Sequence, residues 1–193
     1  MTALRVLVVE DDPMSQKILT SYLAKWGFDY TVATDGEMAW GLLQQQDYPI
    51  VISDWVLPEL SGVDLIRRIR DWSSPHGQIY TVLLTGKNAK EDLVAAMDAG
   101  ADDFVSKPFD RDELRVRLRE GARMVAWDRT VHRQAREIVS QLDEVRALLD
   151  AGVETRPDQA IEIIRQSQAA LQAAYHAACQ LDQRLRPGDV LPN

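Results

Sequence analysis

The chain has 193 residues, of which 46% are hydrophobic, and this length suits one full domain with a smaller second unit. Its formal net charge of −8 at pH 7 argues against sequence-independent binding to nucleic acids and against docking on an anionic membrane surface. The single cysteine excludes an intrachain disulfide and disfavours a cysteine-based zinc site. Since the sequence has no signal-peptide pattern and no apolar run of about 20 residues, which a membrane span needs, we expect a cytoplasmic protein.

Short apolar runs alternate with helical patterns over the first two thirds of the chain. The apolar runs predict strands over about residues 4–9, 30–33, 49–53, 79–84 and 101–106. The helical patterns that follow them cover about residues 13–26, 35–46, 61–72, 90–99 and a stretch from about 111. Strands joined by helical crossovers predict a parallel sheet covered on both faces, so the fold class is α/β.

Residues that favour helix ends mark several of these boundaries. Thr34 or Asp35 could cap the second helix, and Ser61 or Gly62 starts the third. Gly100 is expected to end the fourth helix. These residues support the boundaries that the apolar pattern predicts.

The last third of the chain differs in charge and in rhythm. Residues 1–122 carry 13 basic and 20 acidic residues, a net charge of −7, whereas residues 123–193 carry nine arginines, no lysine and ten acidic residues, a net charge of −1. We therefore divide the chain into residues 1–121 and 122–193. Apolar residues of the second part recur at alternating spacings of three and four, as in a coiled coil, and this pattern predicts two antiparallel helices over about 123–151 and 157–186. The first stripe consists of Val131, Ala135, Ile138, Leu142, Val145 and Leu149.

Polar residues lie at or just after the ends of four predicted strands. They are Asp11, Asp54, Thr85 and Lys107. Ligands of parallel sheets bind at the carboxyl ends of the strands. We therefore expect these four side chains to share one edge of the sheet.

The acidic residues at this edge suggest a metal site. Glu10, Asp11 and Asp12 are consecutive, and Asp54 ends another strand. Carboxylates that converge repel one another, and a divalent cation relieves that repulsion. Oxygen ligands with positions left open for water and phosphate suit Mg²⁺. The alternative is a solvated acidic loop and a helix cap, which is the more common meaning of a Glu-Asp-Asp run by itself.

Asp54 is also a candidate nucleophile, because a carboxylate can attack phosphorus and form an acyl phosphate. Phosphoryl transfer needs positioning and charge stabilisation, which Mg²⁺ and the ammonium of Lys107 can supply. Thr85 offers a hydroxyl, and the Lys107–Pro108 bond is a candidate cis peptide that would aim the lysine inward. Taken singly, Thr85 could instead cap a helix and Lys107 could be an ordinary surface residue.

Four segments together resemble the receiver domains of two-component response regulators. They are VVEDD (8–12), SDWVLP (53–58), LLTG (83–86) and GADDFVSKPF (100–109), in the family's order and spacing. The resemblance covers about residues 3–121. It implies a flavodoxin-like, doubly wound five-stranded parallel sheet of strand order 2-1-3-4-5, which the C-terminal helical hairpin follows.

The resemblance also implies roles at the metal site. Asp54 matches the phosphoacceptor, and Asp11 would bind Mg²⁺ directly. Glu10 would act through a water molecule, and the backbone carbonyl of Val56 would complete the protein ligands. The implied phosphodonor is a sensor histidine kinase or a phosphotransfer protein, and the only implied enzymatic activity is self-catalysed phosphorylation and dephosphorylation of the aspartate.

Three further residues match the family's switching apparatus. Lys107 matches the phosphate-binding lysine, Thr85 the switch hydroxyl and Phe104 the switch aromatic. The chain departs from the usual family pattern in two places. Gly86 stands where alanine is usual, which would loosen access to the site, and Phe104 replaces a tyrosine found in many members, so no phenol hydroxyl can take part.

Three kinds of output are open for residues 122–193. The first is a homodimer or interaction surface formed by the C-terminal helices, with no nucleic acid and no membrane as partner. The second is an enzymatic output, of the cyclase or phosphatase type, in a longer protein of which this chain is a fragment. The third is a transcriptional regulator, which the near-neutral, lysine-free C-terminal part disfavours.

Overall fold

The structure is a computed structural model, and it describes residues 4–72, 74–75, 77–86 and 89–150 together with residues 161, 162, 165 and 169. The second C-terminal helix, predicted over about 157–186, falls outside the described residues apart from those four positions. It therefore stays a prediction.

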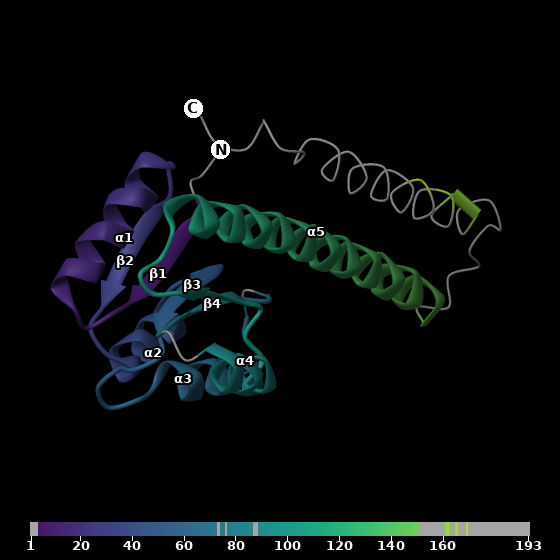
Figure 1. Cartoon of the computed structure of the whole chain (residues 1–193). Helices are drawn as coiled ribbons and strands as arrows, with labels where there is room; N and C mark the ends of the chain where they lie inside the picture. Colours follow the sequence, from purple (N-terminus) through teal and green to yellow (C-terminus); the bar gives the residue numbers. More distant parts are fainter. Residues whose placement is uncertain are drawn as a thin grey trace. The chain divides into compact units, whose positions relative to one another are not determined.

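Five parallel strands form one sheet in the order β2-β1-β3-β4-β5 (Figure 1), which confirms the predicted topology. The central strands are buried on both faces, as the continuous apolar runs of the sequence require. The strands are β1 (Arg5–Val9), β2 (Asp29–Ala33), β3 (Ile50–Asp54), β4 (Tyr80–Thr85) and β5 (Asp103–Ser106).

Five helices accompany the strands, and no helix within the described residues has a stretch apolar enough to cross a membrane. Val6 and Val8 of β1 pack with the helices α1 and α5 on one face, and Leu7 and Val9 pack with α2 and α3 on the other. This alternation gives the two helical layers visible in Figure 1. The helices are α1 (Pro13–Lys25), α2 (Gly36–Gln45), α3 (Gly62–Asp71), α4 (Ala89–Asp98) and α5 (Arg111–Asp150).

Side-chain caps fix the starts of the first three helices. The Asp12 carboxylate accepts a hydrogen bond from the backbone N–H of Ser15 at 2.8 Å and so caps α1. Asp35, rather than Thr34, caps α2, and Ser61 caps α3. Each cap satisfies an amide that the helix itself leaves free, so the loops at the carboxyl edge of the sheet end at defined positions.

Helix α5 is a single helix through the region where the composition of the chain changes. It contains both the helix expected from about residue 111 and the one expected over 123–151. Gly121 lies inside it, where any side chain would collide with the ring of Tyr80 on β4, so glycine allows the helix to approach the sheet closely. The described residues divide into two units between Val125 and Ala126. The division at residue 121 stays a prediction.

Candidate functional site at the carboxyl edge of the sheet

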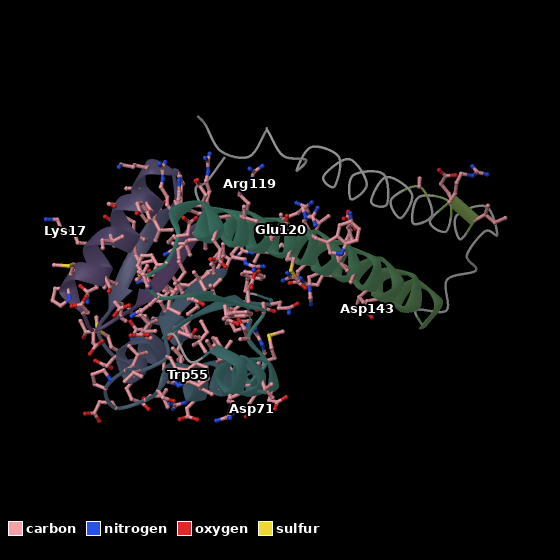
Figure 2. The ribbon with its side chains drawn as sticks, in the orientation of Figure 1. Lys17, Trp55, Asp71, Arg119, Glu120 and Asp143 are labelled. Atoms are coloured by element: carbon pink, nitrogen blue, oxygen red, sulfur yellow. The ribbon has the colours of Figure 1, made fainter. Side chains whose placement is uncertain are left out.

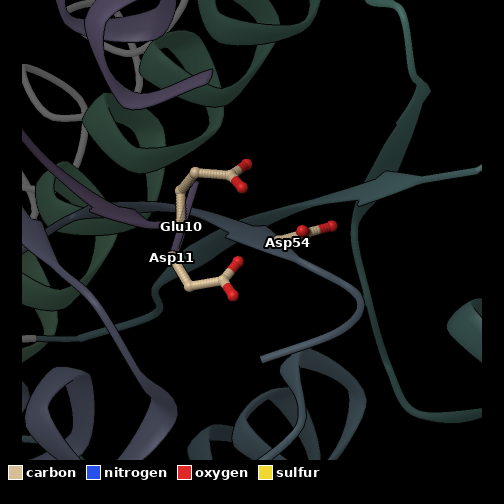
Figure 3. A group of neighbouring side chains, drawn as sticks. All are labelled: Glu10, Asp11 and Asp54. Atoms are coloured by element: carbon tan, nitrogen blue, oxygen red, sulfur yellow. The ribbon is translucent and has the colours of Figure 1, made fainter. Parts of the chain in front are cut away.

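Three carboxylates meet where β1 and β3 end. Glu10 and Asp11 follow β1, Asp54 is the last residue of the neighbouring β3, and Figure 3 shows the three as neighbouring side chains. One oxygen from each lies within 4.8 Å of the others. Oxygens bound to one Mg²⁺ at 2.0–2.1 Å are at most about 4.2 Å apart. A slight movement, or one water between an oxygen and the ion, would therefore let this all-oxygen group hold Mg²⁺.

Lys107 brings a positive charge into the same cluster. Its ammonium lies 2.7 Å from Glu10 Oε2 and 2.7 Å from Asp54 Oδ2. The backbone N–H of Lys107 donates to the carbonyl of Thr85 at 2.6 Å, which extends the pairing of β5 with β4, and the Lys107–Pro108 peptide bond is cis, as predicted. Three carboxylates against one ammonium leave the cluster with a formal charge of −2, which favours a cation.

Burial and charge perturb two groups of the cluster. Glu10 is fully buried, and this desolvation raises the pKa of its carboxyl, because the hydrogen bond from Lys107 lowers it by less and the charge of Asp54 raises it further. Burial by itself would lower the pKa of Lys107. Its hydrogen bonds and charge interactions with Asp54 and Glu10 outweigh burial, so the pKa of Lys107 is raised and the ammonium stays charged.

The side chain of Asp54 is fixed by hydrogen bonding but remains partly exposed to solvent. Its Oδ1 accepts a hydrogen bond from the backbone N–H of Trp55 at 2.7 Å, and its side chain remains 14% exposed. A side chain at Gly62 would collide with the Asp54 carbonyl, so the loop after β3 can close tightly only because this residue is glycine. Trp55, labelled in Figure 2, packs with the cluster of Val63, Ile66 and Leu83. An incoming group can therefore reach a carboxylate of fixed orientation.

The remaining predicted residues lie on β4, on β5 or in the loops that follow β3 and β4. Thr85 ends β4 and is 2% exposed, and its hydroxyl makes a long 3.4 Å contact with the Gly86 carbonyl instead of bonding to Asp54. Phe104 is partly buried against the same apolar cluster as Trp55. Val56 lies two residues after Asp54, with its side chain exposed. A Cβ at Gly86 would meet nothing within 4 Å.

Two contacts at the site were not foreseen from the sequence. The side-chain amide of Gln16 donates to the carbonyl of Glu10 at 2.6 Å, and the N–H of Trp55 reaches the Asp54 carboxylate. Gln16 lies six residues after Glu10 and is the fourth residue of α1. No spacing rule marks such a pair, because the contact depends on how the helix turns back over the loop.

Comparison of the sequence with known proteins shows which family and which proteins this chain resembles. The family described as the response regulator receiver domain matches residues 6–119. The DNA-binding response regulator MtrA of Mycolicibacterium smegmatis is 38% identical over 115 residues, which are 60% of this chain and 49% of that protein. The response regulator RppA of Synechocystis is 37% identical over 124 residues, with the same two shares. The chain thus spans about half the length of these two curated relatives.

Solved receiver structures are similar as well. The receiver domain of the sensor histidine kinase PA1611 from Pseudomonas aeruginosa PAO1 superimposes with a TM-score of 0.57 at 30% identity, covering 63% of this chain and 99% of that one. In that structure a magnesium ion is coordinated in the active-site cleft. The receiver domain of the TMAO respiratory system response regulator TorR gives a TM-score of 0.55 at 31% identity, covering 61% of this chain and 94% of that one.

Replacing Lys107 with methionine should tighten Mg²⁺ binding. The ammonium lies 2.7 Å from the oxygens of Glu10 and Asp54 that a cation would also bind, and removing a unit charge at this distance should lower the Mg²⁺ dissociation constant about tenfold. Calorimetric titration measures the effect, with Arg67→Met as control, because Arg67 forms only an exposed pair with Asp64 on α3. Equal affinities of Lys107→Met and the unsubstituted chain would show that the lysine does not compete with the metal.

Proposed function

This chain belongs to the receiver family of response regulators, and from that premise we propose that it accepts a phosphoryl group on Asp54 from a sensor histidine kinase or a phosphotransfer protein. The observation that carries the proposal is the position of the Asp54 carboxylate. It ends a buried strand, bonds to the ammonium of Lys107 and lies beside the acidic pair Glu10 and Asp11. The Asp54 carboxylate therefore has the ammonium of Lys107, which would orient it, and the acidic pair, which would bind the metal, as neighbours.

The proposed phosphoryl transfer requires mainly that the reacting groups and the positive charges be correctly positioned. A carboxylate oxygen of Asp54 forms a bond to phosphorus while the bond from phosphorus to the donor's leaving group breaks. Glu10, Asp11, Asp54 and the carbonyl of Val56 would hold Mg²⁺, which supplies positive charge to the oxygens of the transferred group. Lys107 keeps its ammonium beside the same oxygens. Attack by water at phosphorus would later restore the carboxylate, so the chain modifies only itself.

We propose that phosphorylation is sensed by Thr85 and Phe104. A phosphoryl group on Asp54 adds acceptor oxygens close to the end of β4, and the Thr85 hydroxyl makes only a long contact in the present structure. Movement of Thr85 toward the phosphoryl group would free space for Phe104 to turn inward. The adjacent Asp103 accepts a hydrogen bond from the N–H of Phe104 and pairs with Arg117 of α5 at 3.2 Å, which supports transmission of the change to that helix.

The proposed output is interaction through the C-terminal helices, with a second copy of the chain as partner. Along α5, Met124, Trp127 and Val131 recur at spacings of three and four and are each 44–48% exposed, so they form an exposed apolar stripe. Burying one such side chain stabilises an interface by roughly 1.5–3 kcal/mol. Enzymatic and DNA-binding outputs of a longer protein remain alternatives, and the curated relatives, of which this chain spans about half, include a DNA-binding response regulator.

Incubation with acetyl phosphate and Mg²⁺ should label Asp54, as located by mass spectrometry. Asp54→Asn should abolish the label, and Asp11→Asn should reduce it about tenfold at limiting Mg²⁺, because it removes one charged oxygen ligand. Asp12→Asn is the matched control, since asparagine caps helices as well as aspartate does and Asp12 caps α1. Unchanged labelling of Asp54→Asn would refute the assignment of the acceptor.

A beryllium fluoride mimic of the phosphoryl group should change amide hydrogen exchange in α4, β5 and the first half of α5. The reason is the proposed movement of Thr85 and Phe104, so Thr85→Val should suppress these changes while Asp54 still reacts with acetyl phosphate. Exchange in the unsubstituted chain and in the variant is compared by mass spectrometry. Changes confined to α1 would contradict the proposed switch.

Sedimentation at tens of micromolar should show a dimer for the full chain and a monomer for a chain ended after Val125. Val131→Asp should disperse the dimer, because it puts a charge into the stripe of three-four spacing, and should leave Asp54 phosphorylation intact. Val139→Asp is the control, since Val139 is an exposed valine of the same helix outside that spacing. A monomeric full chain would rule out self-association.

A further inference from the structure

We propose that Gln16 is a positioning residue for the cation site: its side-chain amide orients the peptide between Glu10 and Asp11 and thereby sets the affinity for Mg²⁺. The inference rests on the proposed function and concerns the same site. Gln16 itself would touch neither the metal nor the phosphoryl group.

The geometry starts from one short hydrogen bond. The Gln16 amide nitrogen lies 2.6 Å from the carbonyl oxygen of Glu10. That carbonyl belongs to the same planar peptide unit as the backbone nitrogen of Asp11, so holding the oxygen fixes the plane from which Asp11 projects. The orientation of the Asp11 side chain therefore depends on the contact made by Gln16.

Other groups already restrain Glu10 itself. Its N–H donates to the carbonyl of Ala33 on β2 at 3.1 Å, and its carboxylate bonds to Lys107 at 2.7 Å. The Asp11 carboxylate, in contrast, is exposed and makes no hydrogen bond or ion pair within the part of the chain that the structure describes. The Gln16 contact, at 2.6 Å, restrains the peptide unit before Asp11, and a longer contact of 3.4 Å from the Asp12 N–H to Glu10 Oε1 restrains the unit after it.

Helix α1 gives Gln16 a rigid base for this role. The N–H of Gln16 donates to the Asp12 carbonyl at 3.0 Å, and Asp12 caps the helix through Ser15. Backbone and side-chain hydrogen bonds therefore both connect the acidic loop to the start of α1. A carboxylate that is oriented before the cation arrives loses less conformational freedom on binding, and contacts of this kind to metal ligands influence affinity strongly.

The test replaces Gln16 with methionine, which keeps the length of the side chain and its helix-forming tendency but removes the donor. Calorimetric titration of the full chain should show Mg²⁺ binding weakened about tenfold, whereas urea unfolding should show a stably folded protein. At saturating Mg²⁺ the rate of labelling by acetyl phosphate should return to within about twofold of the unsubstituted rate, because the defect lies in metal binding. A general loosening of the fold would not be rescued by the metal in this way.

Thr20→Val is the matched control. Thr20 lies one turn further along α1, and its hydroxyl donates to the carbonyl of Gln16 at 2.8 Å without reaching the acidic loop. Its Mg²⁺ affinity should equal that of the unsubstituted chain. Equal weakening in both variants, or no weakening in Gln16→Met, overturns the proposal. If the unsubstituted chain does not bind Mg²⁺, both the proposed metal site and this inference are wrong. If the unsubstituted chain binds Mg²⁺ and Gln16→Met binds it equally well, only the inference about Gln16 is wrong.

Discussion

Repulsion among three carboxylates at one edge of the sheet is the constraint on which the site depends. Glu10, Asp11 and Asp54 have oxygens within 4.8 Å of one another, and Lys107 offsets part of their charge. Such an arrangement costs free energy, since burial raises the pKa of Glu10 and charged groups lose water. The surrounding fold must supply that free energy, and a bound cation would relieve part of the repulsion.

The apolar core of the parallel sheet supplies the free energy that offsets this repulsion. Strands β1, β3 and β4 are covered on both faces by apolar side chains. Glu10 and Asp11 follow β1, and β3 and β4 end in Asp54 and Thr85. Close approach at the edge needs small residues in the loops, as at Gly62 beneath Asp54. Stability and reactivity are thus separated in space, with the apolar layers in the middle and the unfavourable charges at one edge.

Helix α5 joins the receiver core to the residues beyond it. Leu114, Leu118 and Val125 pack into the core, and the Asp103–Arg117 pair ties the helix to β5 next to Phe104. On the same helix, Met124 and Val131 remain exposed. The same helix thus contributes buried residues to the receiver core and also carries exposed apolar residues.

The sequence pattern by itself determined the strands and the boundaries of the first four helices to within a few residues, and it brought the acidic residues and Lys107 to the strand ends, because these features depend on apolar period and on residue types at strand ends. The strand order was implied by the resemblance to receiver domains, not by the period. The tertiary structure alone decided the contacts between side chains that no period relates. Gln16 on the Glu10 carbonyl, Arg117 on Asp103 and Tyr80 over Gly121 are such contacts. Each joins separate elements or reaches from a helix back over a loop, and its distance follows from how those elements pack. A local sequence pattern records the preference of one segment, whereas packing is a property of all of them together.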